Sequence, residues 1–180
     1  MICNQLKECI EKEKRKIELN SKCPNNKIDC IKSSDCRSNV KCEERGKKYI
    51  LENTLKKHIV SYRMDGGVIK TDKLVPPGTC KCDSLLVINS SEYDAILVEL
   101  KGKDVAHAIE QIEGTLVQFK EVFSGFKHIY ARAVVTSSTP DLKATPVCYN
   151  LMEKMKQTYK GNLKISEIKM VEKDTKLKEK

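Results

Sequence analysis

The sequence lacks long apolar runs, and no stretch approaches the roughly 18 consecutive apolar residues that a membrane-spanning helix needs. Its first residues, MICNQLKECIEKEKRKIEL, turn charged almost at once, whereas a secretory signal carries an uninterrupted apolar segment. These two absences predict a cytoplasmic protein that makes no contact with a membrane.

Close Cys-x-x-Cys pairs, the usual mark of a zinc site, are also missing, although nine of the 180 residues are cysteines. Six of the nine lie early and at irregular spacings: Cys3, Cys9, Cys23, Cys30, Cys36 and Cys42. The tightest pair is Cys80 and Cys82. In a chain without a secretory signal, this pattern favours reduced thiols in a loop-rich segment over disulfides or a metal site.

Positive charge is in excess, with 34 lysines and arginines against 25 acidic residues and a formal net charge of +9. Such an excess favours an anionic partner, of which nucleic acid is the main example. The alternative is a lysine-rich surface that only keeps the protein in solution. The hydrophobic content of 39% is that of an ordinary folded domain.

Helices are expected at the start of the chain. Apolar residues spaced among charges predict an amphipathic helix over 2–19, and the Asn-, Ser-, Cys- and Pro-rich stretch 20–40 is expected to be irregular. A second helix is predicted over 41–57, with Tyr49, Ile50 and Leu55 facing inward.

Short apolar runs and a turn signal predict strands from residue 58 onward. HIVSYRMDGGVI (58–69) is expected to be a strand that turns at Asp65-Gly66-Gly67. CDSLLVIN (82–89) and YDAILVELK (93–101) should pair as an antiparallel hairpin. The remaining expected elements are a strand at 128–138, a helix at 147–159, a strand at 161–170 and a flexible tail at 173–180.

A helix is predicted between the strands 93–101 and 128–138. Asp104 is placed to cap its start, and an apolar stripe at spacings of three and four is expected to pack on the sheet. The stripe consists of Val105, Ile109, Ile112, Leu116, Phe119 and Phe123. A polar stripe runs beside it: Asp104, His107, Gln111, Thr115 and Gln118.

Three charged residues at the ends of the hairpin strands form the candidate site. Glu99 and Lys101 are two residues apart in one strand, so they project from the same face, with Leu100 opposite. Asp83 lies across the hairpin and reaches the same place if the register sets it opposite about Glu99. The alternative is a solvated Glu99–Lys101 ion pair of little energetic value.

Two neighbouring carboxylates repel each other, and a divalent cation removes that repulsion. Hard oxygen ligands suit Mg²⁺ or Mn²⁺, which would be held by Asp83, Glu99 and the Leu100 carbonyl. Lys101 could then orient or deprotonate a water molecule and stabilise the oxygens of a phosphate under attack. The cluster therefore predicts hydrolysis of phosphodiester bonds.

The run CDSLLVI, then ILVELKG, then a helix with AIEQIEGTLVQF resembles the PD-(D/E)XK nuclease superfamily over about residues 58–138. That pattern is an Asp at a strand start, an acid-x-Lys on the next strand and a following helix. The resemblance implies that Asp83 and Glu99 bind metal and that Lys101 is the catalytic lysine. Cys82 stands where the family has a nominal proline.

The fold implied is a mixed α/β restriction-endonuclease-like core, αβββαβ, over 41–172, with a helical, cysteine-rich extension at 1–40. Gln111 resembles the glutamine of the QxxxY motif of the RecB-like branch, although Thr115 replaces its tyrosine. Many relatives add an acid from the first core helix, for which Glu52 is preferred here over Glu44. Arg63 and Thr136 are candidate phosphate ligands.

The function expected is a metal-dependent nuclease that acts on DNA rather than RNA, as an accessory or defence enzyme. Cutting a duplex needs two sites, which is compatible with a homodimer or a partner protein. The alternative is a non-catalytic module of the same fold that binds nucleic acid or protein. A cluster-containing nuclease is disfavoured, because such families place three cysteines after the core and here only Cys148 follows it.

Overall fold

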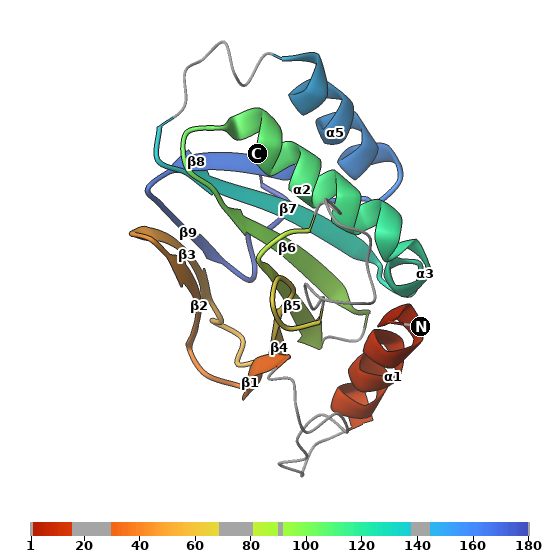
Figure 1. Ribbon diagram of the computed structural model, residues 1–180. Coiled ribbons are helices and arrows are strands. Elements are labelled where there is room, and N and C mark those ends of the chain that lie inside the picture. The colour runs from red at the N-terminus through yellow and green to blue at the C-terminus, as the bar shows by residue number, and fades with distance from the viewer. Residues whose placement is uncertain (1, 16–29, 69–80, 90–91, 138–144, 180) are drawn as a thin grey trace.

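The computed structural model describes residues 2–15, 30–68, 81–89, 92–137 and 145–179 (Figure 1). The described residues form a mixed α/β structure with two mixed sheets, of six and three strands. Helices cover one face of the large sheet, and the small sheet lies on its other side (Figure 1). None of the described helices is long and apolar enough to cross a membrane.

The large sheet has the strand order β1-β4-β5-β6-β7-β8. Its pairs are antiparallel from β1 to β6 and parallel from β6 to β8. The strands are β1 (Ile31–Asp35), β4 (His58–Arg63), β5 (Ser84–Asn89), β6 (Asp94–Leu100), β7 (His128–Val135) and β8 (Leu163–Glu167). The predicted strands at 58–69, 82–89, 93–101 and 128–138 are confirmed within the described residues, and β5 and β6 form the predicted antiparallel hairpin.

Four helices are described: α1 (Ile2–Arg15), α2 (Val105–Gln118), α3 (Lys120–Phe123) and α5 (Pro146–Gln157). The predicted apolar stripe of α2 and α3 is buried at all six positions. Asp104 caps α2 as predicted, because its carboxylate accepts a 2.9 Å hydrogen bond from the His107 backbone nitrogen. Since α2 joins two parallel strands, it crosses back over the sheet (Figure 1) and begins next to the C-terminal end of β6.

The helix predicted over 41–57 is wrong. These residues belong to β2 (Asn39–Glu44) and β3 (Lys47–Glu52), which pair as an antiparallel hairpin. Arg45 and Gly46 both have positive φ, 44° and 79°, as a two-residue turn between twisted strands requires. The period is two rather than 3.6, since alternate residues are buried: Val40, Cys42, Tyr49 and Leu51.

The C-terminal residues are not the expected flexible tail. The last strand predicted at 161–170 is two strands in different sheets, β8 and β9 (Lys169–Lys173), and β9 pairs in parallel with β3. Asp174 is buried and accepts hydrogen bonds from the backbone and hydroxyl of Thr54, at 2.9 and 2.6 Å. Leu177 is only 3% exposed, so the chain remains packed almost to its end.

The N-terminal residues also join the main structure. Leu6 and Ile10 of α1 are buried in the same hydrophobic core as α2. Residues 31–35, expected to be irregular, pair with β4 at the edge of the large sheet. The predictions for 16–29 lie outside the described residues, as do the side chains of Cys3, Cys23 and Cys80; the six described cysteines are free thiols.

A buried arginine connects the two sheets. Arg132 of β7 is fully buried, and its Nε donates to the Glu172 carboxylate of β9 at 2.5 Å. A second guanidinium nitrogen donates to the Leu177 carbonyl at 3.1 Å, and the Tyr49 hydroxyl donates to the same carboxylate at 2.7 Å. The small sheet is therefore held against the large one by a satisfied charged network as well as by apolar contact.

Candidate active site

Asp83 and Glu99 face each other across the β5–β6 hairpin. Ser84 is paired with Val98, which sets Asp83, one residue earlier, opposite Glu99. This is the predicted register. The Asp83 carboxylate accepts a 2.6 Å hydrogen bond from the backbone nitrogen of Leu100, so its orientation is held by the end of the neighbouring strand.

Strand parity places Glu99 on the helix-covered face of the sheet. Ala95 and Leu97 pack in the core beneath α2, whereas Val98 and Leu100 pack toward the small sheet. Glu99 lies on the same face of β6 as Ala95 and Leu97, and only 3% of its surface is exposed. The alternative of a solvated ion pair with Lys101 therefore fails. Within the described parts of the chain, Glu99 Oε2 is buried without a hydrogen-bond partner.

The two carboxyl groups have raised pKa values. Burial raises the pKa of Glu99 to about 9, with the Asp83 charge as the second cause. Burial also raises the pKa of Asp83 to about 6, against the lowering effect of the Leu100 hydrogen bond. The positive charge of Lys101 lowers the pKa of both groups. The site thus holds more potential negative charge than its own surroundings neutralise.

The donor set fits a hard divalent cation that keeps part of its water. No group of three or more acidic, histidine or cysteine side chains suited to a metal occurs among the described residues. Mg²⁺, however, commonly binds through one or two carboxylates together with water and substrate oxygens. The backbone nitrogen of Lys101 donates to the Val134 carbonyl of β7, whereas the backbone nitrogen of Leu100 donates to Asp83 on the other side of β6. The N–H and C=O of one strand residue point to the same side, so the Leu100 carbonyl is directed toward Asp83 as a third oxygen donor.

The polar stripe of α2 holds the chain that leads into Asp83. The Thr115 hydroxyl oxygen accepts a hydrogen bond from Cys82 N at 2.7 Å, and Gln111 Oε1 accepts one from Lys81 N. Gln111 Nε2 lies 2.9 Å from His107 Nε2 on the preceding turn of α2. Gln111 was expected to reach a metal-bound water or a phosphate; here it contacts the backbone two residues before Asp83.

Of the two candidate acids, it is Glu44 and not Glu52 whose charge acts on the pair. The charge of Glu44 contributes to the raised pKa of both Asp83 and Glu99. Glu52 lies at the opposite end of the β2–β3 hairpin, where it pairs with Asn39 and Lys173. Both acids lie on strands, so the idea that a core helix supplies this acid is wrong for this region.

Arg63 and Thr136 lie at the same end of the sheet as the pair but differ in orientation. Arg63 is exposed, and its strand partner on β5 is Ser84. Its neighbours Tyr62 and Met64 are buried in the core beneath α2, so the Arg63 side chain points to the opposite face of the sheet. Thr136 is exposed just beyond β7, and its backbone nitrogen bonds to the Gly102 carbonyl at 3.0 Å. Thr136 is therefore closer than Arg63 to the loop that follows Lys101.

Two contributions were missed from the sequence. Thr115 lies one helical turn after Gln111, and that i, i+4 spacing was the available signal for a shared role. The ion pair between Lys81 and Asp65, 2.9 Å long, joins the turn after β4 to the segment before Asp83 and has no local sequence signal. Asp65 had been interpreted as a turn former only.

The comparisons with known proteins do not assign a function to this site. No family model matches the chain, and no curated protein or solved structure matches it either.

Proposed function

We propose that the protein is a divalent-metal-dependent nuclease that hydrolyses phosphodiester bonds, with DNA as its substrate. The observation that carries this proposal is the buried Asp83–Glu99 pair, with an unpartnered Glu99 oxygen and Lys101 beside it. Burial raises the pKa of both acids despite the charge of Lys101, so keeping both ionised in this site costs free energy, and this favours a bound cation.

The arrangement of elements also supports the proposal. The strands β4, β5 and β6, then α2 and β7, follow one another as in the βββαβ part of the restriction-endonuclease-like order, whereas the first core helix expected over 41–57 is the β2–β3 hairpin. Asp83 immediately precedes the second of these strands, Glu99 lies on the third and Lys101 immediately follows it, as in the PD-(D/E)XK pattern. The other described elements are additions to that order: α1, β1, the β2–β3 hairpin, α3, α5, β8 and β9.

Each residue of the site has a separate role in the proposed reaction. Asp83 and Glu99 would hold Mg²⁺ or Mn²⁺, which supplies positive charge to the phosphate and promotes ionisation of water. The Leu100 N–H holds one Asp83 oxygen, so the other is left for the cation. Lys101 stabilises negative charge that develops on the phosphate oxygens as water adds to phosphorus and the bond to the leaving oxygen breaks.

The test is cleavage of plasmid, linear duplex, single-stranded DNA and RNA with Mg²⁺, Mn²⁺ or EDTA. Wild type should cut at least one DNA substrate in either metal and none in EDTA. Asp83→Ala and Lys101→Ala should be inactive, whereas the exposed-site control Lys120→Ala should match wild type. Cleavage that persists in EDTA or in both site variants would falsify the assignment.

The second candidate is a non-catalytic nucleic-acid-binding module, favoured by the +9 charge alone. It predicts binding that weakens with salt, no cleavage under any metal condition, and no effect of Asp83→Ala beyond stability.

A further inference from the structure

The ends of four strands form one continuous rim that starts at the candidate active site. Four backbone hydrogen bonds connect the end of β6 with β7, then with the β8–β9 turn, and finally with β3 of the small sheet. Their nitrogen–oxygen distances lie between 2.8 and 3.0 Å. They run from Lys101 N to Val134 O, Thr136 N to Gly102 O, Ile168 N to Val135 O, and Lys48 N to Ile168 O.

Two lysines of the small sheet lie side by side on this rim. Lys48 and Lys169 are direct partners on the neighbouring strands β3 and β9, and both lie on the outer face because Tyr49 and Met170 are buried on the inner one. Like charges in this position repel. The Glu43 carboxylate lies 3.1 Å from Lys48, but it also pairs with Lys41, and Lys169 has no carboxylate partner among the described residues.

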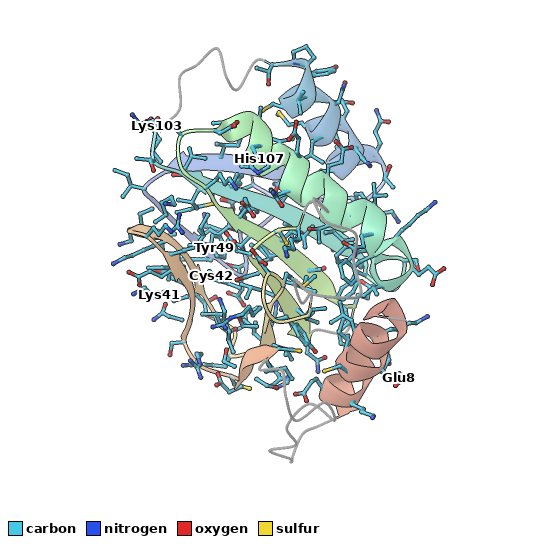
Figure 2. All side chains as sticks on the ribbon, in the orientation of Figure 1. Glu8, Lys41, Cys42, Tyr49, Lys103 and His107 are labelled. Carbon is cyan, nitrogen blue, oxygen red and sulfur yellow. The ribbon has the colours of Figure 1, made fainter. Side chains whose placement is uncertain are left out.

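The positive charge continues on both sides of this lysine pair. Lys103 is exposed in the turn between Lys101 and α2, and Arg45 at the tip of the β2–β3 hairpin has an 86% exposed side chain that lies 3.8 Å from the Glu44 carboxylate. Figure 2 shows Lys103 and Lys41 on the same side of the molecule, one near the start of α2 and the other on β2. The charge therefore follows the rim and is not confined to one strand.

Ile168 stands at the centre of the rim in an unusual conformation. Its φ is +59°, a left-handed value that a β-branched residue seldom adopts, and its side chain is 58% exposed. Glycine or asparagine would fit this turn with less strain. A strained, exposed apolar side chain between the exposed Glu167 and the Lys169–Lys48 pair indicates a surface that contacts something with both charged and apolar parts.

We propose that this basic rim, made of Lys48, Lys103, Ile168 and Lys169, binds the sugar-phosphate backbone of DNA and leads it to Asp83 and Glu99. The lysines contact phosphates, and Ile168 packs against a sugar or a base edge. Three interstrand steps of about 4.8 Å give the rim a length of about 15 Å. Along the axis of a duplex, one strand places a phosphate about every 3.4 Å, so a duplex lying along the rim presents about four phosphates of one strand over this length. The choice of DNA as the ligand rests on the proposed function, whereas the contacts and charges that define the rim do not depend on it.

The experiment measures binding of fluorescein-labelled DNA by anisotropy in EDTA, over a range of NaCl concentrations. Lys48→Glu/Lys169→Glu is compared with Lys7→Glu/Lys12→Glu, which makes the same charge change on exposed positions of α1. The rim variant should bind at least tenfold more weakly, with a salt slope smaller by about two, whereas the α1 variant should stay within a few-fold of wild type. Equal losses in the two variants would overturn the proposal.

Two further variants distinguish a loss of DNA contacts from misfolding of the protein. Lys48→Gln/Lys169→Gln adds no negative charge and should give an intermediate loss of affinity with an unchanged unfolding temperature. Ile168→Gly should raise the unfolding temperature by removing strain but weaken DNA binding about threefold. An Ile168→Gly protein that binds as tightly as wild type would contradict the role given to this side chain.

The outcome separates the rim from the nuclease. If wild type binds DNA through the rim but never cleaves it with Mg²⁺ or Mn²⁺, the proposed DNA-binding role of the rim is supported and the proposed nuclease activity is wrong. If wild type cleaves DNA and the rim variants bind and cleave like the α1 variant, the nuclease activity is supported and the proposed role of the rim is wrong.

Discussion

The Thr115 hydroxyl oxygen accepts a 2.7 Å hydrogen bond from the backbone nitrogen of Cys82, and both residues are fully buried. The hydroxyl proton is donated to the Gln111 carbonyl at 2.9 Å, so the orientation of the hydroxyl is determined. This contact holds the chain one residue before Asp83. It connects the polar stripe of α2 to the position of the first acid.

Thr115→Val should therefore affect both stability and activity. Valine keeps the shape but leaves the Cys82 N–H buried without an acceptor, which costs about 1–3 kcal/mol of unfolding free energy. Cleavage should fall because Asp83 is less firmly placed. Urea unfolding and metal-dependent cleavage check these effects, with Thr115→Ser as the control that retains the hydroxyl. A valine variant with wild-type stability would show that the contact contributes nothing.

Stability without metal should fall as the pH rises. The pKa of Glu99 is about 9 in the folded chain and near 4.5 when unfolded, so between these values the folded state alone holds the proton. The free energy of unfolding then decreases with pH, by at most about 1.4 kcal/mol per unit. Glu99→Gln should flatten this dependence, as measured by urea unfolding in EDTA from pH 5 to 9. A flat wild-type profile would contradict it.

Metal should act on stability and should not require Lys101. A divalent ion at 100 times its dissociation constant adds about 2.7 kcal/mol to the free energy of unfolding. Lys101→Met should keep this stabilisation, measured with Mn²⁺ by thermal unfolding, while cleavage falls by about 10² or more. Asp83→Ala should lose both. If Lys101→Met also abolished the Mn²⁺ effect, the lysine would belong to the metal site itself.

The C-terminal strand should be necessary for the fold. Glu172→Ala leaves the fully buried Arg132 without its carboxylate, and breaking such a pair costs about 3 kcal/mol or more. Glu179→Ala, which removes an exposed pair with Lys176, should change the free energy of unfolding by less than about 1 kcal/mol. Similar values for the two variants, from urea unfolding, would mean that β9 contributes little.

The site could be predicted in part because its geometry is local. Alternation along β6 places Glu99 and Lys101 on one face, and a short hairpin determines which residue lies opposite Glu99. The apolar stripe of α2 was visible for the same reason. Gln111 was placed on the correct face, but its contact with Lys81 depends on a segment about thirty residues away, and no periodicity shows that.

The errors fall where long-range pairing decides. Residues 41–57 carry enough charge and apolar spacing for a helix, but the Arg45-Gly46 turn and the core formed with β9 favour strands. Residues 169–179 look like a solvated end until Arg132 and Thr54 supply their partners. The charge of Glu44 raises the pKa of both acids because the β2–β3 hairpin packs on the large sheet.

The sequence by itself determined the βαβ segment, the shared face of Glu99 and Lys101 and the excess of positive charge, because these follow from periods of two and 3.6 and from composition. Only the tertiary structure decided that Glu99 is buried, that Thr115 and Gln111 hold the approach to Asp83, and that lysines of the small sheet and of the β6–α2 turn join in one rim. These features depend on packing between segments far apart in the chain, which creates the low-polarity surroundings and the unlike neighbours that no local pattern contains.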